Sequence, residues 1–436
     1  MTGKVIRDPV HGDIFVRRAH LDFIDTWVFQ RLRGIKQLGA SYLVYPGAVH
    51  TRFEHSLGTA WVADRMIASI RRNCGRRAIS HDEEIIIATY ALIHDITHIP
   101  YGHTLEDERR VFKRHDENDV RIDYFLGHRE VDSALKSLGV RQEIHELMHH
   151  GRSAKGVRPH CYDIVAGTVC ADLLDYLTRD AYFTGLQQQY DQRVYQYFCV
   201  GPGGLYIDLM KNNLFRPDAL TEITNLLRLR YTLSERVYFH HAKIAASAML
   251  SKAVELALSR KRLREADMYS MTDDVFVAAL RNSTPAAKRI VDLMQRRQLY
   301  KICYLLTRRD EDLPEQFAMY HREPARRAEQ ERLIAKKAHV PFESVTIYCP
   351  SPTMQLKEAK VLFLTQQKGV PDVLRNDPEI ELLKAKHRAL WRFFVFLDRA
   401  HKDERRAVGR ACQEVFGVPN EIASYRHPPY RAALGL

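Results

Sequence analysis

The feature that most constrains the fold is the apolar run from Ile85 to Ile93, which is followed directly by His94 and Asp95. Ser80 and Glu83 stand at capping-box spacing before the run, which predicts a helix buried on nearly all sides. Such a helix needs other elements packed around it. An imidazole and a carboxylate buried together at its end are unfavourable unless they are paired or bind a metal, so this end is also a candidate functional site.

Most of the first 260 residues show apolar residues at helical intervals. The predicted helices, besides the one that ends near His94, are Asp22–Lys36, Glu54–Arg72, Ile164–Asp180 and Leu226–Leu258. Beyond about residue 260, charged stretches alternate with short apolar segments, and the predicted elements are strands at Val345–Tyr348 and Val361–Leu364 and a helix at Glu379–Arg399. We therefore expect a mostly α protein with a helical core over residues 1–260 and a smaller mixed α/β lobe over 261–436.

The composition excludes a mostly disordered chain, because 45% of the 436 residues are hydrophobic and 10% are aromatic. The formal net charge of +12 favours anionic partners, either phosphorylated metabolites or nucleic acid. Seven dispersed cysteines indicate reduced thiols, and no apolar run approaches the roughly 20 residues that cross a bilayer. We expect a cytoplasmic protein without a membrane partner.

The histidines around the central apolar run form an ordered set. His98 follows His94 by one helical turn, and further imidazole and carboxylate groups precede and follow this segment: His55, His103, Glu106, His115 and Asp172. One histidine of this kind is more often a core residue bonded to a backbone carbonyl. The whole set predicts a site for a divalent transition metal, namely Fe, Mn, Zn, Ni or Co.

A second histidine pattern, HELMH, spans His145 to His149 and matches the His-Glu-x-x-His pattern of zinc peptidases. It lies in a short polar helix that ends at Gly151, and the sequence offers no evident third ligand. Because short patterns arise readily in a chain with 21 histidines, we interpret it as a chance match.

The chain resembles the HD-domain dNTP triphosphohydrolases through DPVHGDI, FQRLRGIKQLG, YPGAVHTRFEHSLG, ALIHDITHIPYGH and DYLTRD, and the resemblance extends to about His241. It implies hydrolysis of a dNTP to a deoxynucleoside and inorganic triphosphate, with a second Mg²⁺ beside the transition metal. The metal ligands that it implies are His55, His94, Asp95 and Asp172. It also implies that His103, Glu106 and His115 handle the proton at the leaving oxygen, with Glu106 orienting His103.

The resemblance implies substrate contacts as well. His98 and Arg52 would contact phosphates, and the positions that would surround the sugar, phosphates and base are Gln37, Leu38, Tyr176, Asp180, Arg230 and Tyr238. In vertebrate relatives a guanine nucleotide binds between subunits, which implies a regulatory GTP or dGTP at Asp25, Gln30 and Arg33 and a dimeric or tetrameric homo-oligomer. His241 replaces the lysine that holds a second nucleotide there.

Several positions depart from the family pattern and leave the substrate open. Glu106 replaces an aspartate, Leu173 replaces a basic residue that grips phosphate, and Ser234 replaces a histidine near the substrate. One alternative is an HD phosphatase or phosphodiesterase acting on a nucleotide monophosphate or a signalling nucleotide. Another is a nucleic-acid-binding protein, supported by the basic clusters Arg71–Arg77, Arg260–Arg264 and Arg405–Arg406.

The helix predicted around Asp172 carries a polar face, because Asp172, Asp175, Tyr176 and Arg179 follow helical spacing. Arg179 stands four residues after Asp175, so we expect the two to pair.

Overall fold

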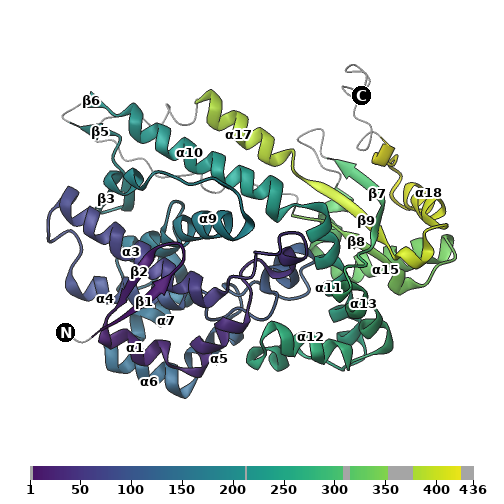
Figure 1. Cartoon of the computed structure of the whole chain (residues 1–436), viewed down its shortest axis with the longest axis horizontal. Coiled ribbons are helices and arrows are strands. Elements are labelled where there is room, and N and C mark those ends of the chain that lie inside the picture. Colours follow the sequence, from purple (N-terminus) through teal and green to yellow (C-terminus); the bar gives the residue numbers. More distant parts are fainter. Residues whose placement is uncertain (1–2, 212–213, 308–314, 352–376, 424–436) are drawn as a thin grey trace.

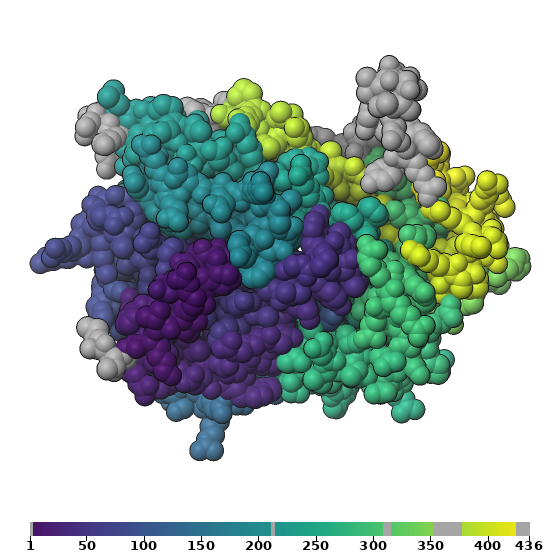
Figure 2. Space-filling view, viewed as in Figure 1, coloured from purple at the N-terminus to yellow at the C-terminus, as the bar shows by residue number. Residues whose placement is uncertain are grey.

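The computed structural model describes residues 3–211, 214–307, 315–351 and 377–423. Helices make up most of this part of the chain, and its sheets have two or three strands (Figure 1). The N-terminal segments lie at one end of the molecule and the C-terminal segments at the other, with the residues around 200–300 packed between and across them (Figure 2). The structure therefore confirms a mostly α fold with a smaller mixed lobe near the C-terminus.

The centre of the core is α3 (Arg52–Cys74), which packs against α4 (His81–Ile93) and α9 (Ala171–Thr184). Capping boxes begin both α3, through Thr51 and Glu54, and α4, through Ser80 and Glu83. The predicted helices in these two regions are confirmed. Gly58 lets α3 approach α9 closely, since a Cβ there would lie 1.9 Å from Asp175 Oδ1.

Three predicted helices are interrupted. Residues 22–36 form α1 (Arg18–Ile24), α2 (Trp27–Gln30) and a 3-10 turn, because Thr26 is extended and its hydroxyl accepts a hydrogen bond from the Phe29 amide. The helix predicted from Ile164 begins instead as α8 (Pro159–Ala166), which ends at an extended Gly167 before α9. The helix predicted over Leu226–Leu258 is divided among α10 (Pro217–Leu233), a π-helical turn (Ser234–Tyr238) and α11 (His241–Ser259).

The remaining elements of the core are a hairpin at the N-terminus, helices that close the lower side in Figure 1, and two short hairpins before α10. They are β1 (Lys4–Asp8), β2 (Gly12–Val16), α5 (Asp119–Leu126), α6 (Arg129–Leu138), α7 (Arg141–His150), β3 (Phe198–Gly201), β4 (Gly204–Ile207), β5 (Met210–Lys211) and β6 (Leu214–Phe215).

The C-terminal lobe follows α12 (Asp273–Arg281) and α13 (Pro285–Gln295). It contains an antiparallel sheet of strand order β7-β9-β8, built from Lys301–Thr307, Arg392–Leu397 and Val345–Tyr348. The helices of this lobe are α14 (Glu315–Arg322), α15 (Pro324–Lys337), α17 (Pro378–Arg388) and α18 (Arg405–Phe416). A separate hydrophobic cluster gathers here around Trp391 and Phe393.

The strand prediction at Val345–Tyr348 is confirmed, and the prediction at Val361–Leu364 lies outside the described residues. The helix predicted over Glu379–Arg399 is wrong in its second half, which forms β9. The segment RFFVFL is rich in aromatic residues and five of its six residues are buried, which favours the central strand of a sheet.

Within the described ranges, no helix combines the length and the apolar character needed to pass through a lipid bilayer.

Candidate metal centre and active site

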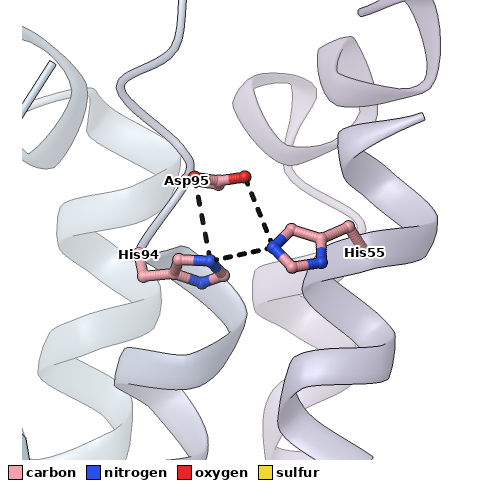
Figure 3. Close-up of side chains that lie close together, drawn as sticks. All are labelled: His55, His94 and Asp95. Atoms are coloured by element: carbon pink, nitrogen blue, oxygen red, sulfur yellow. Dashed lines mark hydrogen bonds and ion pairs between the residues drawn. The ribbon is translucent and has the colours of Figure 1, made fainter. Parts of the chain in front are cut away.

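The four predicted metal ligands lie together where three helices meet. His55 belongs to α3, His94 and Asp95 follow α4, and Asp172 belongs to α9 (Figure 3 shows the first three). His55 Nε2 lies 3.3 Å from His94 Nε2 and 3.0 Å from Asp172 Oδ1. Asp95 Oδ2 lies 3.8 Å from His55 Nε2, and Asp95 Oδ1 lies 3.7 Å from His94 Nε2. The Asp172 side chain is 33% exposed, so the group is accessible from that side.

Hydrogen bonds orient both imidazoles as in protein metal sites. His94 Nδ1 donates to the Ala91 carbonyl at 2.8 Å, and His55 Nδ1 donates to Asp175 Oδ2 at 2.7 Å. Each ring therefore turns its Nε2 lone pair toward the other ring and toward Asp172. Two facing lone pairs repel each other unless a proton or a cation lies between them. The donor set thus fits a divalent transition metal.

The electrostatics of the site agree with this fit. Burial alone would lower the pKa of His55, but Asp172 and Asp175 raise it to about 10. Burial opposes ionisation of Asp95, yet Arg52, His94 and His98 hold its pKa well below the usual value. The site therefore holds ionised carboxylates and attracts a positive charge, which a metal ion supplies in place of the proton on His55.

A second layer of polar residues supports the ligands. Asp175 contacts His55, accepts from His11 Nε2 at 2.6 Å, and pairs with Arg179, whose Nη1 donates to Asp8. The predicted pairing of Arg179 with Asp175 is confirmed. The role of Asp175 toward His55 was not predicted, although its position one turn after Asp172 was a usable signal. His11 gave no such signal.

The predicted catalytic histidines form a row beside the metal centre. The ring centroids of His98 and His115 are 3.6 Å apart, and those of His98 and His103 are 4.8 Å apart. His98 Nε2 lies 3.2 Å from Asp95 Oδ1, which joins the row to the ligand group. Burial, Arg52 and His115 keep the pKa of His98 well below its usual value, so His98 is neutral.

The structure corrects the expected partner of His103. Glu106 Oε2 accepts from His115 Nδ1 at 2.9 Å, whereas His103 Nδ1 lies 3.0 Å from Asp107 Oδ2. The reason is the π-helical turn over Thr104–Glu108, which directs Glu106 inward and leaves Asp107 beside the half-exposed His103. Burial opposes the charge on His115, but Glu106 raises the pKa of this histidine.

The π-helical turn and the Arg109 that follows it are held by contacts with α5 on one side and with the C-terminal lobe on the other. Arg121 Nη1 of α5 donates to Glu106 Oε1 at 2.5 Å, and Arg109 reaches into the C-terminal lobe. Tyr101 and Arg110, which flank the turn, have positive φ values of 55° and 45°. Such conformations cost about 1–3 kcal/mol each and persist only where surrounding contacts impose them.

The residues predicted around the sugar and base also lie together. Asp180 accepts from Tyr238 at 2.6 Å and contacts His50 Nε2 at 2.8 Å. The Arg230 guanidinium lies 4.9 Å from the ring of Tyr176 and 5.3 Å from that of Tyr238. The half-buried Leu38 lies next to Gln37, whose Oε1 is buried and has no hydrogen-bond partner among the described residues. His50 was not among the predicted residues.

The positions that depart from the family pattern carry no basic group toward the site. Leu173 is buried in the hydrophobic core, and the Ser234 hydroxyl donates to the Arg230 carbonyl at 2.9 Å. The buried Arg52 bonds Asp95 at 2.5 Å through Nη1, and its Nε has no hydrogen-bond partner within the described part of the chain.

The predicted regulatory residues lie on the surface near the start of the core. Asp25 and Arg33 are exposed, and Arg33 Nε donates to Gln30 Oε1 at 2.8 Å. The Arg33 guanidinium also lies 3.5 Å from the Phe53 ring centroid.

Comparisons with known proteins agree with this site. A sequence model of the HD domain matches residues 52–180, and a model of the HD associated region matches residues 218–427. The uncharacterized protein MJ1154 of Methanocaldococcus jannaschii is 33% identical over 305 residues, covering 68% of this chain and 59% of that protein. Deoxynucleoside triphosphate triphosphohydrolase SAMHD1 of Bos taurus is 26% identical over 348 residues, covering 69% of this chain and 58% of that protein.

The chain thus spans about three fifths of the length of these curated relatives. A crystal structure of a hypothetical protein from Aquifex aeolicus superposes with a TM-score of 0.68 at 23% identity, covering 93% of this chain and all of that one, which shows a shared fold. The matched HD model includes all four residues of the ligand group, and the model of the HD associated region covers most of the chain beyond α9. The chain therefore belongs to the HD-domain family.

Proposed function

We propose that this protein is a metal-dependent phosphohydrolase that cleaves dNTPs to a deoxynucleoside and inorganic triphosphate. The observation that carries the proposal is that the metal ligands adjoin two other groups. They meet the histidine row where Asp95 contacts His98, and they share α9 with Asp180 of the Asp180–Tyr238–Arg230 group. Asp172 and Asp180 lie on the same helix, about 12 Å apart along its axis, a span suited to a nucleotide with its sugar at one end and its phosphates at the other.

A divalent transition metal held by His55, His94, Asp95 and Asp172 would supply Lewis-acid chemistry by activating water and polarising a phosphoryl group. Arg52 would bind phosphate oxygens through its Nε, which has no hydrogen-bond partner among the described residues, and the neutral His98 would contact phosphate through its single N–H. Asp180 and Gln37 would accept hydrogen bonds from the sugar hydroxyl, and Tyr176, Arg230 and Tyr238 would enclose the sugar and base. These side chains orient the α-phosphorus toward the metal ligands.

The hydrolysis forms a bond from water oxygen to the α-phosphorus and breaks the bond from this phosphorus to the 5′-oxygen, which takes up a proton. His115 is the better donor because Glu106 raises its pKa, whereas His103 is 46% exposed and bonded to Asp107. The Glu106→Gln substitution should lower the pKa of His115, and the alkaline limb of the pH–rate profile should therefore move to lower pH. Replacement by Asp107→Asn should leave that limb in place, and the reverse pattern would assign the proton to His103.

A product assay tests the main proposal. The protein is incubated with each of the four dNTPs and Mn²⁺, with and without GTP, and the products are resolved by ion-exchange chromatography. We expect a deoxynucleoside and triphosphate, and their loss in His94→Ala. Release of monophosphate or single phosphates would contradict the proposal.

A second candidate function is a phosphatase or phosphodiesterase acting on a nucleotide monophosphate or signalling nucleotide. Its support is the apolar Leu173 and the internally bonded Ser234, which offer no charge to a long phosphate chain. The same assay with those substrates separates the two. The nucleic-acid alternative has less support, because arginines of its clusters bond their own chain: Arg71 to Ile79, Arg264 to Asp267 and Arg405 to Ile302.

Regulation by GTP or dGTP belongs to the proposal as a separate part. Asp25, with its exposed carboxylate, would accept from the guanine N1 and N2 protons, and Gln30 and Arg33 lie on the same surface. In a homo-oligomer this surface would meet a neighbouring subunit. Activation by GTP that disappears in Asp25→Asn, with unchanged unstimulated activity, would support it, and activation retained in that variant would contradict it.

A further inference from the structure

A second group of metal-ligating side chains lies on the outer side of the core, between α5 and α7. His145 and His149 stand one turn apart on α7, and Asp119 and Asp123 stand one turn apart on the contacting helix α5. One donor atom from each of Asp123, His145 and His149 lies within 4.8 Å of the other two. The third donor that the HELMH pattern lacked in the sequence thus comes from another helix.

Both ring nitrogens of His149 face carboxylate oxygens, an arrangement that favours a cation. Its Nδ1 lies 3.0 Å from Asp119 Oδ1, and its Nε2 lies 3.0 Å from Asp123 Oδ1. A neutral imidazole has only one N–H, so it satisfies only one of these two carboxylates. When Nδ1 donates to Asp119, the Nε2 lone pair faces Asp123, and a metal ion between them relieves the repulsion. His55 has the same arrangement between Asp175 and Asp172.

His145 supplies an independent observation. Its Nε2 is buried, yet it has no hydrogen-bond partner in the described part of the chain. A buried imidazole nitrogen without a partner is unfavourable, and ligation to a metal is one way to satisfy it. The side chains of Asp119 and Asp123 are 77% and 66% exposed, so ions reach this group directly from solvent.

The arrangement does not fit the peptidase role of the HELMH pattern. In that role the glutamate acts as a general base beside the metal. Here Glu146 Oε2 accepts a hydrogen bond from the Lys155 amide at 2.9 Å. This bond holds the Glu146 carboxylate against the loop that follows α7. The group therefore offers ligands without the base that the peptidase chemistry requires.

We propose that His145, His149 and Asp123 bind a divalent transition metal of the zinc class at the surface between α5 and α7. This site is separate from the HD centre, which is the ligand group of His55, His94, Asp95 and Asp172. Two imidazoles and one carboxylate suit Zn²⁺, Co²⁺ or Ni²⁺, with water in the remaining positions. Asp119 orients His149 and does not bind the ion. The ion links α5 to α7, and α5 also carries Arg121, which bonds Glu106. The site thus stabilises the helix that supports the His115–Glu106 pair.

The test measures zinc content in the full chain. Wild type, His149→Ala and His145→Ala are stripped with a chelator, dialysed against Zn²⁺ and analysed for metal per chain. We expect each variant to bind one zinc ion fewer than wild type. His150→Ala, an exposed histidine on the same helix, is the matched control and should bind as much as wild type.

A further variant separates this site from the HD centre. His94→Ala should lose the metal of the HD centre and keep the ion between α5 and α7, so that adding His149→Ala removes the remaining ion. Unfolding midpoints measured in chelator should differ little between wild type and His149→Ala, because without metal this side chain pairs only with the solvent-exposed carboxylates of Asp119 and Asp123. Equal zinc content in wild type and His149→Ala, or an equal loss in His150→Ala, would overturn the proposal.

Discussion

The HD centre and a second cluster of buried charge in the described part of the chain differ in how their positive and negative groups balance. At the HD centre, the permanent cations that the carboxylates of Asp95, Asp172 and Asp175 contact among the described residues are Arg52 and Arg179. At the junction with the C-terminal lobe, two glutamates face three cations. Arg109 contacts both Glu255 and Glu331, Arg327 contacts Glu255, and Lys252 contacts Glu331.

The second cluster, which we call the junction cluster, is complete without an added ion. Arg109 Nη1 lies 2.9 Å from Glu331 Oε1, and Lys252 Nζ lies 2.5 Å from Glu331 Oε2. Burial alone would raise the pKa of Glu331, but Arg109 and Lys252 lower it to about 2. The HD centre instead has imidazole lone pairs and carboxylates that face one another. Buried charge is therefore compatible with a purely structural role, and a deficit of positive charge distinguishes the proposed metal site from the junction cluster.

The two clusters are joined by one short segment. Glu106 contacts His115 beside the HD centre, and Arg109 belongs to the junction cluster. The C-terminal lobe therefore anchors the end of the turn that carries Glu106, the hydrogen-bond partner of the proposed proton donor His115.

The largest expected effect comes from removing a carboxylate at the HD centre. Asp95→Asn should lower hydrolytic activity by at least about a thousandfold, because a proposed metal ligand and the partner of Arg52 are lost together. Activity and bound metal are measured on the same sample, with the exposed Asp274→Asn as control. Retention of both metal and activity in Asp95→Asn would refute the metal centre.

A substitution in the junction cluster should change the stability of the protein but not its metal content. Glu331→Ala leaves Arg109 and Lys252 without their shared partner and should lower the free energy of unfolding by about 3–5 kcal/mol. Urea unfolding measures this, with Glu329→Ala on the exposed side of α15 as the matched control. If Glu331→Ala lost metal and kept its stability, the distinction between the clusters would be wrong.

Asp175→Asn tests the support behind the ligands. The imidazole of His55 loses the carboxylate that orients it, so metal affinity should fall by about 10- to 100-fold. Calorimetric titration with Mn²⁺ gives the affinity, and Tyr182→Phe, at an exposed position of α9, serves as control. Unchanged affinity would mean that Asp175 serves only to hold Arg179 and His11.

The smallest effect is a proton released on metal binding. Without metal, Asp172 and Asp175 overcome burial and raise the pKa of His55 from 6.5 to about 10. The charged His55 stabilises the metal-free fold fully below about pH 6.5, and this stabilisation is lost as the pH rises through about 10. Metal loading between these values should therefore release one proton from His55, which a pH indicator in weak buffer records. Loading without proton release near neutral pH would contradict the charge deficit at the HD centre.

The sequence determined the elements and groups that depend on neighbouring residues. The capping boxes of α3 and α4, the apolar run of α4 and the pairing of Arg179 with Asp175 all rest on contacts within a few residues. The chemistry of the ligand set was also evident, because imidazole and carboxylate groups at a buried helix end need a cation or a partner.

Only the tertiary structure decided which distant groups meet. Asp175 reaches His55 across 120 positions of sequence, and Glu331 reaches Arg109 across 222. The choice of His115 over His103 as the partner of Glu106 depends on a π-helical turn, and Asp123 reaches His149 because α5 packs on α7. Sequence spacing specifies the face of one helix on which a side chain lies. The neighbour that the face meets depends on packing of the whole chain, and this packing brings together the charges that create the site.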